Sequence, residues 1–93
     1  MEKFYYSVKR GDTALKIAER FSIPVTVLIR DNALSAEVYE GQVLVVINRG
    51  GFLYTVRPED TLKSIAKKFD KQESEIRVQN GLDYIFYGIK ILL

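Results

Sequence analysis

The chain repeats itself: a pattern of apolar, acidic and glycine positions in its first half returns 48 residues later. Tyr6 is matched by Tyr54, and Asp12 is matched by Asp60. Further pairs at this offset are Val8 and Val56, Thr13 and Thr61, Ile17 and Ile65, Ala18 and Ala66, Phe21 and Phe69, Asn32 and Asn80, and Leu34 and Leu82. The offset then falls to 47, where Gly41 is matched by Gly88. Repetition at this period indicates two copies of one small folding unit.

Each copy opens with the alternation of apolar and polar positions that is typical of a strand, as in Phe4, Tyr6 and Val8. Gly11 and Asp12 interrupt the strand, and the second copy places Asp60 at the same point. An apolar stripe at helical spacing follows in both copies. Its members are Ala14, Ile17, Ala18 and Phe21 in the first copy, and Leu62, Ile65, Ala66 and Phe69 in the second.

A second short helix is expected after Pro24 in the first copy, and after Asp70 or Gln72 in the second. Asn32 and Asn80 are expected to end these helices, because asparagine tolerates the left-handed conformation. Closing strands are expected at residues 43–47 and 89–93. Each copy is therefore predicted to be a βααβ module, an α+β fold in which a two-stranded antiparallel sheet carries two helices on one face.

The repeat predicts two tandem modules at residues 1–48 and 49–93, joined by a linker at about residues 48–51. The linker sequence Asn-Arg-Gly-Gly is short and of a flexible type. A module of this size buries only a small core and is marginal on its own. We therefore expect the two modules to touch.

Two missing residue types exclude most catalytic and metal-binding functions. The chain has no cysteine and no histidine, which removes thiolate chemistry, the commonest general base and the commonest metal ligand. The sequence pattern does not place any two carboxylates in a common cleft. We therefore expect neither an enzyme nor a bound cofactor. The net charge of +2 comes from 14 basic and 12 acidic residues that are mixed along the chain. Nucleic-acid binding would need a clustered basic stripe.

Targeting signals are also missing from the pattern. No stretch approaches the roughly 20 apolar residues of a membrane span. Residues 1–6 lack the charged leader and apolar run of a signal peptide. We therefore expect a chain that acts in the cell that makes it, leaves by a non-classical route, or is a piece of a longer protein.

The pattern in both copies resembles the lysin motif (LysM). The first copy carries it in Tyr6, Val8, Gly11, Asp12, Thr13, Ile17, Ala18, Phe21, Leu28, Asn32, Gly41 and Leu44. The second copy carries it in Tyr54, Val56, Asp60, Thr61, Ile65, Ala66, Phe69, Ile76, Asn80, Gly88 and Ile91. Two full patterns in tandem cover nearly the whole chain, which makes the resemblance specific.

The resemblance implies a non-catalytic module that binds N-acetylglucosamine polymers, either peptidoglycan or chitin, at a cell wall or spore surface. Its groove lies between the turn after the first strand and the loop before the last strand. On this chain, those segments are 11–15 with 33–38, and 59–63 with 81–85. The candidate glycan-binding residues are Gly11, Asp12, Thr13, Ala14, Ala33, Leu34, Ser35, Val38, Asp60, Thr61, Leu62, Gly81, Leu82, Asp83, Tyr84 and Ile85.

The chemistry of such a groove agrees with these residue types. An acetamido sugar offers an amide donor, a carbonyl acceptor and a methyl group. Backbone groups of the two loops can pair with the amide, and Ala14, Leu34, Leu62, Leu82 and Ile85 can hold the methyl. Tyr84 either stacks on a sugar face or packs against the protein. A shallow groove gives modest affinity, which two linked modules raise through effective concentration.

Some positions depart from the family pattern. Glu59 stands where the turn glycine belongs, and glutamate fits poorly if that position needs a positive φ. Ala14 stands where a larger apolar residue is usual, and Leu15 and Lys63 replace a frequent tryptophan. These departures predict that at least one groove is altered or silent. Asp12 and Asp60 are interpreted as helix caps rather than ligands.

A surplus of apolar residues keeps a second function open. Positions beyond those needed for each core are Tyr5, Val25, Val27, Ile29, Val43, Val45, Ile47, Phe86, Tyr87 and Leu92. They pack between the modules, or they bind a second copy or a protein partner. The alternative function is therefore a protein-interaction module on the same fold, as in spore-coat or cell-envelope assembly, with little or no glycan affinity.

Overall fold

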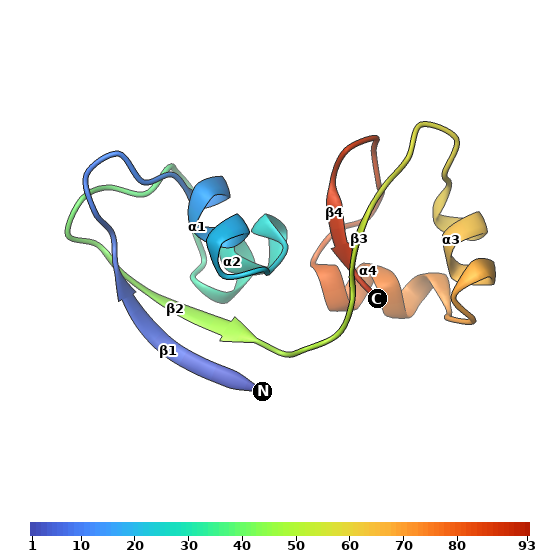
Figure 1. Ribbon diagram of the computed structural model, residues 1–93, viewed down its shortest axis with the longest axis horizontal. Coiled ribbons are helices and arrows are strands. Elements are labelled where there is room, and N and C mark those ends of the chain that lie inside the picture. Colours follow the sequence, from blue (N-terminus) through green and yellow to red (C-terminus); the bar gives the residue numbers. More distant parts are fainter. The chain divides into compact units, whose positions relative to one another are not determined.

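The computed structural model describes all 93 residues, which form two compact units, Met1–Gly50 and Gly51–Leu93, here called the first and second modules. The elements of the first module are β1 (Glu2–Ser7), α1 (Ala14–Arg20), α2 (Val25–Asp31) and β2 (Val43–Asn48). Those of the second module are β3 (Leu53–Thr55), α3 (Leu62–Lys68), α4 (Glu73–Asn80) and β4 (Lys90–Leu92) (Figure 1). No helix has the length and apolar character that crossing a membrane requires.

Each module builds a two-stranded antiparallel sheet from its first and last strands. β1 pairs with β2 from Glu2 opposite Asn48 to Ser7 opposite Val43. The second sheet is shorter, because β3 and β4 are each only three residues long. The two helices of each module lie on one side of its sheet (Figure 1). This arrangement confirms the predicted α+β fold of two βααβ modules.

The apolar stripes predicted from the sequence form the two cores. In the first module, the fully buried side chains include Ile17, Leu28, Leu44 and Val46, and in the second they include Ile65, Ile76 and Ile91. A tyrosine from the first strand meets a phenylalanine from the end of the first helix edge to face in both modules. The ring centroids are 5.4 Å apart for Tyr6 and Phe21, and 5.3 Å apart for Tyr54 and Phe69. The two modules therefore use one packing scheme.

Asn32 and Asn80 do end their helices as expected, but neither adopts the left-handed conformation that was the reason for expecting it. Asn32 has a φ of −112°, and Asn80 is the last helical residue of α4. The left-handed residue comes one position later in both modules, at Ala33 with φ +50° and at Gly81 with φ +63°. Glycine accepts this conformation more readily than alanine.

The two asparagines instead tie the second helix to the closing strand. Asn32 Nδ2 donates to the Val45 carbonyl at 2.8 Å, and Asn32 Oδ1 accepts from the Val45 N–H at 2.8 Å. Asn80 forms the same pair of hydrogen bonds with Leu92. Each Nδ2 also donates to the carbonyl four residues earlier in its own helix. The sequence therefore predicts that each asparagine lies at a helix end, but it does not predict the hydrogen bonds that its side chain makes to the closing strand.

The connection between the modules is anchored on both sides. Arg49 pairs with both carboxylate oxygens of Asp31, at 2.7 and 3.0 Å. The Gly50 N–H donates to Asn48 Oδ1 at 2.8 Å. Gly51 has φ +101°, and a Cβ there would lie 2.9 Å from a side-chain carbon of β4. The free part of the connection is therefore very short.

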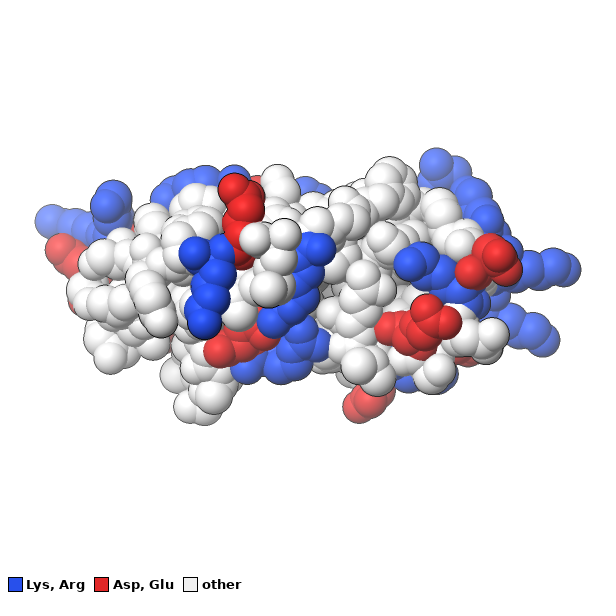
Figure 2. Space-filling view, turned by 90° about the horizontal axis from the view of Figure 1, so that it is seen from below, with Lys and Arg blue, Asp and Glu red and all other residues white.

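Charged side chains of both signs are interspersed with uncharged surface on the face drawn in Figure 2. Several form ion pairs within their own module, including Arg20 with Asp12 at 3.2 Å and Arg77 with Glu73 at 3.6 Å. On that face, they do not merge into one continuous basic stripe.

The surplus apolar residues range from buried to exposed, and Val25, Val45 and Ile47 among them are partly buried. Val27 and Leu92 are buried, so they are not part of an exposed contact surface. Tyr5 and Val43 are exposed and point away from the core on the β1–β2 sheet, where their neighbours in the strands, Tyr6 and Leu44, face inward. Phe86 and Tyr87 are exposed as well. Their use as a contact surface stays a prediction.

Candidate functional site

The turn after the first strand is fixed by backbone hydrogen bonds to the segment before the last strand. In the first module, the Gly41 N–H donates to the Val8 carbonyl at 2.8 Å. Gly11 has φ +86°, a conformation that favours glycine. Glu59, its counterpart in the second module, is not among the residues with positive φ. The second turn therefore follows a different path, and glutamate is not strained there.

The interpretation of Asp12 and Asp60 as helix caps is wrong, because the cap is the threonine that follows each of them. The Lys16 N–H donates to Thr13 Oγ1 at 3.1 Å. Thr61 accepts from the Ser64 N–H at 3.0 Å, and Ser64 Oγ accepts from the Thr61 N–H at 2.9 Å, which completes a capping box. Both threonines are thereby engaged by the first turn of a helix.

The Asp12 carboxylate stabilises the turn by binding three donors. The Tyr6 hydroxyl donates to Oδ2, the Lys9 N–H donates to the same oxygen at 2.9 Å, and Arg20 donates to Oδ1 at 3.2 Å. These donors, the Tyr6 hydroxyl first, lower the pKa of Asp12 below its usual range. The same hydrogen bond raises the pKa of Tyr6. Asp12 is thus a structural anchor of the candidate site.

The second module repeats this anchor with one change. The Tyr54 hydroxyl donates to Asp60 Oδ2, and the Arg57 N–H donates to the same oxygen at 2.8 Å. Their hydrogen bonds, that of Tyr54 first, lower the pKa of Asp60. Lys68 takes the place of Arg20 and lies 5.7 Å from the centre of the Tyr54 ring instead of pairing with the hydroxyl. The second turn therefore has one side-chain hydrogen-bond donor fewer.

Glu37 joins the two candidate segments of the first module, and the sequence did not single it out. Its Oε1 accepts from the Ala14 N–H at 2.8 Å and from the Val38 N–H at 3.0 Å. These two backbone donors, that of Ala14 first, lower the pKa of the Glu37 carboxyl. The turn after β1 and the loop before β2 therefore lie side by side. The only sequence signal was an acidic residue beside Val38, opposite a turn with free amides.

The second module has no acidic side chain at this point, because Tyr84 occupies the position that matches Glu37. The Leu62 and Ile85 amides, which match those of Ala14 and Val38, have no hydrogen-bond acceptor within the chain. Leu82 and Ile85 pack against the core cluster that contains Leu62. The loop is braced by Arg77, whose Nε donates to the Asp83 carbonyl at 3.0 Å.

The candidate residues differ widely in exposure. The exposed ones are Gly11, Ala33, Ser35, Thr61, Gly81, Asp83 and Tyr84. The partly buried ones are Asp12, Thr13, Leu34, Asp60, Leu82 and Ile85. Ala14, Val38 and Leu62 are buried and belong to the cores. Tyr84 is 72% exposed, so its ring is accessible for stacking on a ligand.

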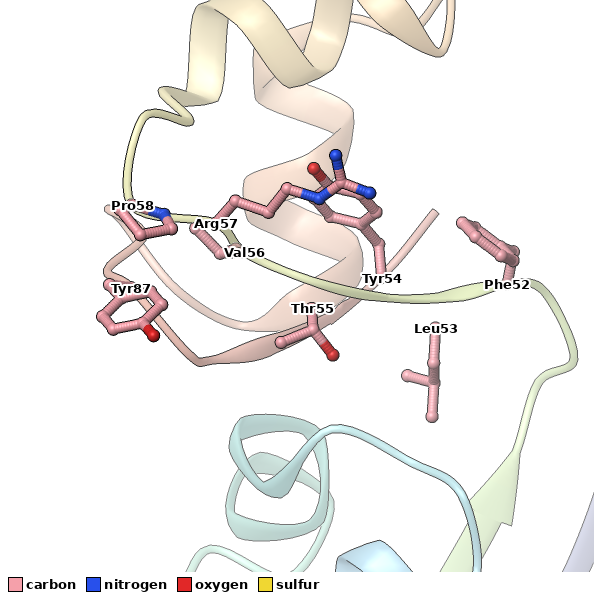
Figure 3. A pocket seen from close by; sticks show the side chains of 8 residues that line it. All are labelled: Phe52, Leu53, Tyr54, Thr55, Val56, Arg57, Pro58 and Tyr87. Carbon is pink, nitrogen blue, oxygen red and sulfur yellow. The ribbon is translucent and has the colours of Figure 1, made fainter.

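A pocket of about 480 Å³ lies elsewhere on the second module (Figure 3). Its lining residues are Phe52, Leu53, Tyr54, Thr55, Val56, Arg57, Pro58 and Tyr87. None of them belongs to the candidate glycan-binding set. The pocket runs along β3 and is open to solvent.

Comparison with known proteins identifies the repeated unit. The model of the LysM domain family matches residues 6–46 and 54–90, which together are most of the chain. An autolysin of Enterococcus faecalis (strain ATCC 700802 / V583) is 33% identical over an alignment of 111 residues. That alignment covers 96% of this chain and 15% of the autolysin.

Two solved structures of spore cortex-lytic enzymes named SleL are also similar. The enzyme of Bacillus megaterium QM B1551 is 30% identical with a TM-score of 0.49, covering 96% of this chain and 22% of that chain. The enzyme of Bacillus cereus is 23% identical with a TM-score of 0.48, covering 100% of this chain and 23% of that chain. The chain spans less than a quarter of each relative. On the family match over both of its modules, this chain belongs to the LysM domain family and carries two copies of the domain in tandem.

Proposed function

We propose that the chain is a non-catalytic glycan-binding protein that recognises N-acetylglucosamine polymers, with peptidoglycan as the first candidate and chitin as the second. Membership of the LysM family supports binding of such glycans in general. The similarity to an autolysin favours peptidoglycan and a place at the cell wall. A spore surface is the other location consistent with this glycan.

The observation that carries the proposal is the contact between the two candidate segments. The hydrogen bond from the Ala14 N–H to Glu37 joins residues 23 positions apart in sequence. In the second module, Leu82 and Ile85 pack on the core that contains Leu62. The first module therefore has backbone amides at this contact that Glu37 already binds, whereas in the second module the Leu62 and Ile85 amides have no acceptor within the chain and lie beside small apolar side chains. That combination suits an acetamido group, which has a carbonyl acceptor and a methyl.

A binding role rather than catalysis is supported by the groups at these loops. Three of the acidic residues there have assigned partners: Asp12 and Asp60 bind a tyrosine hydroxyl, and Glu37 binds two backbone amides. The chain has no histidine or cysteine to serve as a base or nucleophile.

The proposal is tested by co-sedimentation of the chain with insoluble peptidoglycan and with chitin, followed by an amide-resolved NMR titration with a soluble N-acetylglucosamine oligomer. We expect pelleting with peptidoglycan and saturable shifts within residues 11–15, 33–38, 59–63 and 81–85. Absence of both pelleting and shifts would contradict glycan binding. Shifts confined to other residues would contradict the assigned grooves.

A second candidate function is protein assembly through the outer face of the β1–β2 sheet. Tyr5 and Val43 are 72% and 63% exposed there. Exposed apolar residues that lie together often mark a contact surface. Analytical ultracentrifugation of the chain and of the Tyr5→Ser/Val43→Thr variant tests this function. A monomer at all concentrations in both proteins would count against self-assembly.

A further inference from the structure

We propose that Glu37 closes the groove of the first module with its own carboxylate, so that the second module is the one that takes up the sugar first. This inference rests on the proposed glycan-binding function and adds a division of labour between the modules. On this inference, Glu37 determines which of the two modules binds the glycan at the lower sugar concentration.

In the first module, the Glu37 carboxylate already occupies the place that the carbonyl oxygen of a bound sugar would take. Glu37 Oε1 lies 2.8 Å from the Ala14 nitrogen and 3.0 Å from the Val38 nitrogen. These two amides come from the two sides of the groove. The carboxylate therefore spans the groove and uses both donors at once.

The second module lacks this contact, although its fold is the same. Tyr84 stands at the position of Glu37 and is largely exposed. The matching amides, those of Leu62 and Ile85, have no acceptor within the chain. Asp83, the nearest acidic residue in this loop, is exposed and its carbonyl is held by Arg77. These two amides therefore remain available to an acceptor from outside the chain.

Competition between the two acceptors explains why the difference matters. A sugar carbonyl that enters the first groove must displace an ionised carboxylate, and hydrogen bonds to an ionised acceptor are about twice as strong as neutral ones. The displaced Glu37 also needs to move away from the sugar. In the second module, the same carbonyl displaces only water. We expect the affinities of the two grooves to differ by about tenfold or more.

The first test is an amide-resolved NMR titration of the wild-type chain with an N-acetylglucosamine oligomer. Residues 59–63 and 81–85 are expected to saturate at sugar concentrations about tenfold below those needed for residues 11–15 and 33–38. Equal saturation of both modules, or earlier saturation of the first, would overturn the inference while leaving the proposed function in place. No saturation in either module would remove the proposed function and this inference with it.

The second test removes the carboxylate. Glu37→Ala is compared with Glu40→Ala, which makes the same charge change at an exposed residue that forms no contact with the groove amides. Glu37→Ala is expected to increase the affinity of the first module about tenfold and leave that of the second unchanged. Glu40→Ala is expected to change neither. An unchanged first module in folded Glu37→Ala would overturn the inference.

A third measurement needs no ligand and covers the case in which Glu37→Ala loosens the loop. Hydrogen exchange of the Ala14 amide is expected to be slower than that of Leu62 in the wild-type chain, because only Ala14 has an acceptor. Glu37→Gln retains an acceptor oxygen and should preserve part of this protection, whereas Glu37→Ala should abolish it. Equal exchange at Ala14 and Leu62 in the wild type would show that Glu37 does not occupy the groove.

Discussion

Asn80 holds Leu92 by both of its backbone groups: its Nδ2 donates to the Leu92 carbonyl at 2.8 Å, and its Oδ1 accepts from the Leu92 N–H. Asn80 is the one polar residue that is fully buried in the chain. The strand β4 is therefore bound on one edge by β3 and on the other by a side chain of α4. The Asn80 side-chain amide thus satisfies both backbone hydrogen-bonding groups of Leu92, in a closing strand only three residues long.

Replacing Asn80 by alanine leaves a buried N–H and a buried carbonyl without partners. We expect Asn80→Ala to lower the free energy of unfolding of the second module by about 2–3 kcal/mol, because each unsatisfied buried group costs about 1–3 kcal/mol. Urea unfolding followed by the amide signals of β4 measures this loss. Asn32→Ala provides the comparison, since its matching hydrogen bonds are only partly buried and its loss should be smaller. Equal losses of unfolding free energy in the two variants would show that burial does not determine how much these hydrogen bonds contribute.

Removal of the Tyr54 hydroxyl should raise the pKa of Asp60. The hydroxyl is the first cause of the lowered pKa, and Tyr54→Phe removes it while keeping the ring in the core. NMR titration of the carboxyl carbons measures the change. Tyr6→Phe should shift Asp12 less, because Arg20 still donates to that carboxylate. An unshifted Asp60 in Tyr54→Phe would contradict the hydrogen bond.

The stability of the chain should fall in acid because of the same two carboxylates. Asp12 and Asp60 have lowered pKa values in the folded chain, so the unfolded chain binds more protons as the pH drops. Their contribution is complete above about pH 4, the usual range of an aspartate, and is lost as the pH falls through the folded pKa values. Melting temperatures between pH 7 and pH 2 measure this effect. An Asp12→Asn/Asp60→Asn variant should show a flatter profile, and an unchanged slope would count against this origin.

The two turns after the first strands should respond differently to glycine. Gly11→Ala places a Cβ on a residue with φ +86°, and we expect it to destabilise the first module by about 1 kcal/mol. Glu59→Gly should not stabilise the second module, because Glu59 does not have a positive φ. Thermal unfolding of both variants provides the measurement. A gain in stability for Glu59→Gly would mean that its turn is strained after all.

Stacking on Tyr84 should contribute to glycan affinity in the second module. Tyr84→Ala is expected to weaken binding by roughly threefold to tenfold, since an aromatic contact contributes about 0.5–1.5 kcal/mol. Tyr87→Ala is a matched control, because Tyr87 is 71% exposed but lies outside the candidate loop. Isothermal titration with an N-acetylglucosamine oligomer compares the two. Equal losses, or none for Tyr84→Ala, would exclude the stacking role.

The sequence predicted the fold well because its signal is periodic and occurs twice. The stripe of Ile17, Ala18 and Phe21 returns in the second copy, so chance agreement was remote. The helices and strands follow from such spacing, and the family match confirms the tandem LysM identity. The spacing of apolar side chains identifies the buried face of a helix or strand, even when the residues that pack against that face are unknown.

The sequence predicted side-chain roles less well, because these depend on long-range contacts. Asp12 was placed next to a helix start and was interpreted as its cap, but Tyr6 and Arg20 compete for the same carboxylate. Glu37 lies in an irregular loop, and one of its two donors, the Ala14 amide, reaches it only because the fold brings the turn after β1 next to that loop. Local patterns do not show which distant donor a flexible carboxylate will reach.

The residues of the linker are each held by hydrogen bonds or close packing within the module beside them. Arg49 is held by Asp31, the Gly50 N–H is held by Asn48, and Gly51 fits closely against β4. If both modules bind one glycan strand, as the proposed function requires, the length of this connection limits the spacing of the two contact points. A single residue inserted there would change avidity for a long glycan strand while leaving both grooves untouched.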